Sequence, residues 1–173
     1  MPSQSFYELH RDDCDQHEYG VVAEVARSLN SYMQTGEILK RIGDANRKGI
    51  ASSEIQACVI EHATQLGFHS ERQGLFSEYA TGSLRPDYFL SLTPGRGIIL
   101  EVEKGKTLTN NMDLLDLWKC HICNHAQYLF LMVPRIAQNA GPKSVFDSVV
   151  KRMQPFFRKK NYVDVYGLFI FGY

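Results

Sequence analysis

The chain has 173 residues, of which 44% are hydrophobic and 22% are charged, and its formal net charge is zero. This composition predicts one soluble globular domain with an N-terminal extension, and the neutral charge excludes overall basicity as an argument for nucleic-acid binding. Apolar runs are too short to cross a membrane and residues 1–18 are too polar and acidic for a signal peptide, so we expect a cytoplasmic protein that does not bind membranes.

The N-terminal part of the chain is predicted to be helical. Apolar residues recur at helical spacing from residue 18 to about residue 47, and Thr35-Gly36 divides this stretch into two helices. We assign residues 1–48 to an N-terminal helical extension and residues 49–173 to the core domain. Ser52 or Ser53 can cap a third helix that ends near Gly67, with Glu54 in its first turn.

Three strands are predicted next, over residues 68–74, 84–92 and 97–104, with turn residues at positions 93–95. Asp87 lies in the second strand, while Glu101 and Glu103 follow the apolar start of the third. Because side chains alternate along a strand, Glu101 and Glu103 share one face, and pairing of the two strands brings Asp87 to them. The sequence therefore predicts three carboxylates that converge on one point.

The remaining elements complete an α/β sandwich around a mixed sheet. A helix is predicted from about residue 110 to residue 125, and we expect Met112, Leu115, Trp118 and Ile122 on its apolar face. The continuous apolar run of residues 128–133 predicts a strand covered on both faces. A helix over residues 144–157 and a strand over residues 163–171 follow. The four cysteines do not form a dense disulfide framework, so we expect reduced thiols.

This order of elements, with Pro86-Asp87 on the second strand and Glu101 on the third, resembles the PD-(D/E)xK nuclease superfamily. The resemblance covers roughly residues 49–134 and implies a restriction-endonuclease-like fold. At the position of the family's lysine this chain has Glu103, and a minority of restriction enzymes are similar in carrying Glu-x-Glu. Glu54 resembles the extra acidic residue that archaeal Holliday-junction resolvases carry at the head of their first helix.

The resemblance implies a DNA endonuclease that depends on Mg²⁺ or Mn²⁺. Carboxylate oxygens are suitable ligands for these ions, so Asp87 and Glu101 are expected to bridge the metal, and Glu103 to orient a water or hold a second ion. Lys104 reaches the site only if the strand bulges. The predicted catalytic residues are therefore Glu54, Asp87, Glu101, Glu103 and Lys104.

Nucleic-acid contacts are predicted for local basic residues before the first core helix and after the third strand, namely Arg47, Lys48, Lys104 and Lys106. Cleavage of both strands of a duplex would favour a homodimer.

Other interpretations remain open at this point. The protein could be a catalytically inactive relative that binds nucleic acid or a protein partner, which the missing lysine and the neutral charge favour. Glu101 and Glu103 could instead line a solvent-facing strand, and Glu54 could be favoured by the helix dipole alone. A structural metal site is a weaker possibility, with candidate ligands Cys120, His121, Cys123 and His125.

Overall fold

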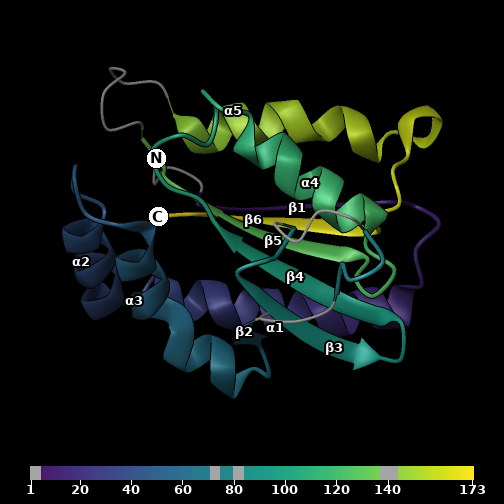
Figure 1. The fold of residues 1–173 in the computed structure, drawn as a ribbon, viewed down its shortest axis with the longest axis horizontal. Coiled ribbons are helices and arrows are strands. Elements are labelled where there is room, and N and C mark those ends of the chain that lie inside the picture. The colour runs from purple at the N-terminus through teal and green to yellow at the C-terminus, as the bar shows by residue number, and fades with distance from the viewer. Residues whose placement is uncertain (1–4, 71–74, 80–83, 137–143) are drawn as a thin grey trace.

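A computed structural model describes residues 5–70, 75–79, 84–136 and 144–173. In this part of the chain a six-stranded mixed sheet is flanked by five α-helices, with α4 and α5 on one face and α1, α2 and α3 on the other (Figure 1). The elements are β1 (Phe6–His10), α1 (Gln16–Met33), α2 (Gly36–Ala45), α3 (Ser52–Gln65), β2 (His69–Ser70), β3 (Tyr88–Thr93), β4 (Arg96–Val102), α4 (Met112–Ile122), β5 (Tyr128–Val133), α5 (Val145–Met153) and β6 (Gly167–Gly172), with 3₁₀ turns at Gln154–Phe157 and Lys159–Asn161 before β6.

The strands follow the order β1-β6-β5-β4-β3-β2 across the sheet. Strands β2, β3 and β4 form an antiparallel meander, in which Gly95 adopts a positive φ of 75° in the tight turn between β3 and β4. Helix α4 then crosses over to β5, which runs parallel to β4, and α5 leads to β6, which runs parallel to β5. Strand β1 pairs antiparallel with β6 and closes that edge of the sheet.

Two apolar cores lie on opposite faces of the sheet. The residues of β5 are buried on both faces, as the continuous apolar run predicted. Phe130 points into the core formed with α1, α2 and α3, which includes Leu29 and Ile55. Leu129 points into the core formed with α4 and α5, which includes Leu117 and Val149. The sheet is therefore held between two layers of helices.

Most of the predicted elements are confirmed. The N-terminal helices divide at Thr35, and the third helix, the crossover helix and strand β5 lie close to their predicted positions. Of the predicted strand 68–74, only His69 and Ser70 form a strand, and residues 71–74 lie outside the described residues. Strand β1 was not predicted. All four cysteines are free thiols, and among the described residues no helix combines the length and the hydropathy required to cross a bilayer.

The predicted apolar face of α4 is wrong at Leu115 and Trp118, although Ile122 does pack against the core beneath the helix. Leu115 and Trp118 are 40% and 47% exposed, whereas Asp113, Asp116 and Lys119 are buried. Asp113 ion-pairs with Arg152 of α5 at 3.5 Å, so the polar side of α4 faces the protein. The buried side of α4 therefore combines these charged residues with Leu117 and Cys120, which pack in the core beneath the helix.

Candidate functional site

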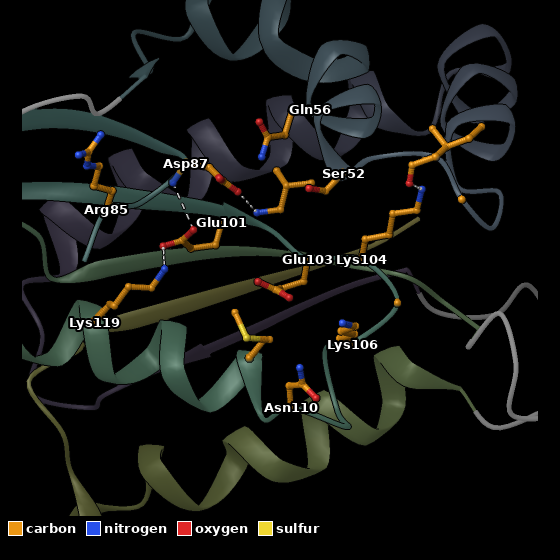
Figure 2. Close-up of a pocket in the computed structure, with 15 residues that line it drawn as sticks. Ser52, Gln56, Arg85, Asp87, Glu101, Glu103, Lys104, Lys106, Asn110 and Lys119 are labelled. Atoms are coloured by element: carbon orange, nitrogen blue, oxygen red, sulfur yellow. Dashed lines mark hydrogen bonds and ion pairs between the residues drawn. The ribbon is translucent and has the colours of Figure 1, made fainter. Parts of the chain in front are cut away.

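A cleft of about 520 Å³ lies where β3 begins and β4 ends, between the N-terminus of α3 and helix α4 (Figure 2). Polar side chains from both strands, both helices and the loop after β4 converge on it. Its polar lining comprises Ser52, Gln56, Arg85, Asp87, Glu101, Glu103, Lys104, Lys106, Asn110 and Lys119. The strand pairing places Asp87, which precedes β3, beside the end of β4.

Asp87 and Glu101 form a hydrogen-bonded pair across the two strands. The Asp87 backbone N–H donates to Glu101 Oε2 at 3.2 Å, and Asp87 Oδ2 accepts from the Val102 N–H at 2.8 Å. Gln56 of α3 also hydrogen-bonds to the Asp87 side chain. The two carboxylates predicted from sequence are therefore brought together and fixed by backbone donors (Figure 2).

Lys119 of α4 completes this arrangement, although the sequence analysis did not predict it. Its Nζ donates to Glu101 Oε1 at 2.5 Å and lies 2.8 Å from Asp116 Oδ1. The side chains of Lys119, Glu101 and Asp116 are only 10%, 4% and 0% exposed. A buried lysine thus bridges one predicted site carboxylate and one carboxylate that was not predicted.

Glu103 also lies in the cleft, on the same side of β4 as Glu101, and its carboxyl group lies near that of Asp116. Two ionised carboxylates at such a contact repel each other, which favours a proton on one of them. Burial, followed by the charge and hydrogen bond of Asp116, raises the pKa of Glu103 to about 8. Glu103 is therefore largely protonated at neutral pH.

The other ionisable groups of the cluster are shifted by the same two causes, burial and neighbouring charge. Burial raises the pKa of Asp87, and burial with the nearby charge of Asp116 raises the pKa of Glu101 well above its usual value. Burial alone would lower the pKa of Lys119, but the carboxylates of Glu101 and Asp116 outweigh it and raise that pKa. Lys119 therefore stays charged among carboxyl groups that are hard to ionise together.

Lys104 does not reach these carboxylates. It follows Glu103, points away from the cluster and donates from Nζ to the carbonyl oxygens of Ala45, Arg47 and Ile50 at 2.8, 3.2 and 2.6 Å. It therefore ties β4 to the loop between α2 and α3, as Figure 2 shows. Lys104 was expected to reach the carboxylates only if the strand bulged, and the pairing of β4 with β5 is regular up to Val102.

The remaining predicted residues differ in their positions. Lys106 is exposed and lines the cleft. Glu54 does not line it, because its side chain faces a smaller hollow beside Arg41 of α2. Arg47 ion-pairs with Asp44, and both Arg47 and Lys48 are exposed outside the cleft lining. The structure thus joins Asp87, Glu101, Glu103 and Lys106 in one cleft and leaves Glu54, Arg47 and Lys48 outside it.

The cleft offers a donor set that suits Mg²⁺ or Mn²⁺, since Asp87, Glu101 and Glu103 supply only carboxylate oxygens. Their oxygens already accept from Lys119 and from backbone N–H groups, and no group of three or more His, Cys, Asp or Glu side chains in the described residues converges as a preformed metal site. A metal ion would thus have to replace some of the hydrogen bonds that Lys119 and the backbone N–H groups donate to these oxygens.

The proposed ligands of a structural metal do not form such a group either. Cys120 and Cys123 are buried in the core beneath α4, and the ring of His121 accepts a hydrogen bond from the Asp164 N–H at 2.9 Å. His125 lies beside a different hollow, near Phe89.

Asp116 and Lys119 carry a signal in the sequence that was overlooked. Together with Asp113 they recur every three residues, so all three fall near one side of α4. Charged residues at this spacing within an otherwise apolar helix indicate a polar face, and only the fold shows that it is buried against β4 and α5.

Comparison with family models found no match, and a search of curated proteins also found none.

Proposed function

We propose that the protein is a metal-dependent DNA endonuclease of the PD-(D/E)xK superfamily, with its active site in the cleft between α3 and α4. One observation carries the proposal: Asp87 and Glu101 hydrogen-bond across neighbouring strands, and a buried lysine contacts the same Glu101 carboxylate. Two carboxylates and a lysine at one point are the groups that the resemblance implies for phosphodiester hydrolysis.

The order of the strands also supports a restriction-endonuclease-like fold. The antiparallel meander β2-β3-β4 is followed by the crossover helix α4 and a parallel strand, which is the order on which the sequence resemblance rests. Asp87 precedes β3, and Glu101 lies near the C-terminal end of β4, where the cleft opens. Glu101 thus lies within β4, and Asp87 lies one residue before β3 and is held to β4 by the Val102 N–H.

Lys119 accounts for the departure from the family motif. Two positions after Glu101 the chain has Glu103, and the ammonium group is supplied by Lys119 on α4 instead. From beside Glu101, this ammonium can donate to an oxygen of the phosphate or hold the attacking water. A Mg²⁺ or Mn²⁺ ion bound by Asp87 and Glu101 would lower the pKa of a bound water and offset the charge developing on the phosphate.

The walls of the cleft provide contacts for a nucleic-acid backbone. Figure 2 shows Arg85 and Lys106 on either side of Glu101 and Glu103. Both side chains are exposed, and a phosphate chain that crosses the carboxylates would contact both cations. This local placement supplies the attraction for phosphate that a net charge of zero does not.

The test is cleavage of supercoiled, linear, branched and single-stranded DNA with Mg²⁺ and with Mn²⁺. Asp87→Asn and Glu101→Gln should abolish cleavage because they remove the metal ligands, and Lys119→Met should reduce it by about 100-fold or more. Glu61→Gln changes an exposed carboxylate on α3 and should cleave like the wild type.

Two results would contradict the proposal. Absence of metal-dependent cleavage on every substrate would favour the second candidate, a protein that binds nucleic acid or a protein partner without cutting. Cleavage that survives both Asp87→Asn and Glu101→Gln would place the active site elsewhere.

A further inference from the structure

Lys119 holds the atoms that a metal ion would bind. Its ammonium contacts Glu101 Oε1 at 2.5 Å and Asp116 Oδ1 at 2.8 Å, and it forms part of the wall of the cleft. Both partners are hard carboxylate oxygens, the ligand type that Mg²⁺ prefers. The ammonium of Lys119 therefore occupies a position beside Glu101 Oε1 that a metal cation could otherwise take.

A metal ion on Glu101 would conflict with Lys119 in its present position. Glu101 Oε1 accepts from Lys119 and Oε2 accepts from the Asp87 N–H, so an ion on this carboxylate would join a group that already carries the ammonium. With a Mg²⁺–oxygen distance of roughly 2.1 Å, an ion on Oε1 and the ammonium would lie less than about 5 Å apart. Two cations at this separation in a buried site repel each other strongly.

We propose that Lys119 is a built-in counter-ion that competes with the divalent cation for Glu101, so that metal binding requires the lysine to move off this carboxylate. The inference rests on the proposed function, because it assumes that Glu101 is a metal ligand. The cleft beside Lys119 gives the flexible side chain room to move, and Asp116 remains as a partner for its ammonium. In the metal-free protein, Lys119 thereby offsets the repulsion between Glu101 and Asp116, and it weakens the protein's affinity for the metal ion.

The experiment measures Mn²⁺ binding to the full chain by electron paramagnetic resonance, without nucleic acid. Lys119→Met should lower the Mn²⁺ dissociation constant by about tenfold or more, because it removes the competing charge. Lys119→Arg keeps the charge and should leave binding as weak as in the wild type. The same Lys119→Met protein should cleave DNA more slowly, so metal affinity and activity change in opposite directions.

A second variant covers the case in which Lys119→Met does not fold because its partner carboxylates are left unpaired. The double variant Lys119→Gln/Asp116→Asn removes one positive and one negative charge together, and it should also bind Mn²⁺ more tightly than the wild type. Thermal unfolding and circular dichroism establish that each variant is folded before binding is measured.

The outcomes separate this inference from the proposed function. If the wild type binds Mn²⁺, Asp87→Asn loses it, and neither Lys119→Met nor Lys119→Gln/Asp116→Asn binds more tightly than the wild type, the competition is overturned while the metal site stands. If none of the proteins binds Mn²⁺, the metal-dependent function fails and the inference fails with it.

Discussion

At the scale of single residues, two nearby lysines have separate tasks. Lys104 donates to three backbone carbonyls, that of Ala45 at the end of α2 and those of Arg47 and Ile50 in the loop that follows. Lys106 is exposed at the cleft and forms no side-chain hydrogen bond or ion pair with the described part of the chain. The first lysine is therefore structural, and the second is the one that the proposed function assigns to a phosphate contact.

Substituting each lysine by methionine separates these tasks. Lys104→Met should lower the free energy of unfolding by about 1–2 kcal/mol, since hydrogen bonds from a charged donor are lost at a partly exposed site. Lys106→Met should leave stability within about 0.5 kcal/mol and weaken DNA binding instead. Urea unfolding and fluorescence anisotropy with a labelled oligonucleotide measure the two effects. A stability loss in Lys106→Met as large as that in Lys104→Met would contradict the assignment.

Glu103 makes stability depend on pH. Its pKa is raised to about 8 in the folded protein, mainly by burial and then by Asp116, against an ordinary value of 4.5. Between these two values the folded state binds more protons than the unfolded state, so stability falls as pH rises from 4.5 to 8. Because Glu103 is partly exposed, we expect a loss of roughly 1–3 kcal/mol over this range.

Glu103→Gln should make this fall smaller, because glutamine removes the proton that Glu103 loses, whereas Asp87 and Glu101, whose pKa values are also raised, remain. Urea unfolding at several pH values, in buffer with EDTA, measures the slope for the wild type and the variant. A wild-type stability that rises from pH 5 to pH 8, or an equal fall in Glu103→Gln, would show that Glu103 is not the responsible group.

At the scale of elements, α4 is turned with its charged side inward. Leu117 is 3% exposed and packs in the core beneath α4, while Leu115, two residues earlier, is 40% exposed. Leu117→Ala should therefore cost about 2–5 kcal/mol of stability, and Leu115→Ala should change it by no more than about 0.5 kcal/mol. Urea unfolding of the two variants checks the orientation. A larger loss from Leu115→Ala would restore the orientation that periodicity predicts.

The same helix shows why only part of the site could be predicted. Asp87 and Glu101 were predicted because alternation along a strand and the pairing of adjacent strands are local rules that place side chains reliably. Lys119 and Asp116 reach the site through the packing of α4 across the sheet, which sequence periodicity does not determine. A lysine for the site was therefore sought at Lys104, next to Glu103, whereas the lysine that contacts Glu101 is Lys119 on α4.

Strand β1 illustrates a similar limit. Phe6 to His10 is a short segment with no turn signal to identify its partner, and it pairs antiparallel with β6, which lies more than 150 residues away in the chain. The central strand β5 could be predicted because its continuous apolar run requires burial on both faces. Elements that depend on a distant partner are thus the ones that sequence patterns miss.

At the scale of the whole molecule, the N-terminal helices are part of the core. Val22, Ala26, Leu29 and Met33 of α1 are fully buried and share one core with residues of the sheet, including Phe130. Each large side chain in such a position contributes roughly 1.5–3 kcal/mol, and total stabilities are commonly about 5–15 kcal/mol. Losing α1 would therefore remove much of the stability and uncover one face of the sheet.

We expect a chain of residues 49–173 to be unfolded or aggregated, although this range holds all the carboxylates of the cleft. A chain of residues 11–173 is the matched control, because it lacks β1 but keeps α1 and α2. We expect it to fold with reduced stability, because removing β1 exposes the edge of β6. Circular dichroism, size-exclusion chromatography and thermal unfolding compare both with the full chain. If residues 49–173 unfold cooperatively near the full chain's melting temperature, the expectation is wrong. Residues 1–48 would then be an extension that the rest of the chain does not need in order to fold.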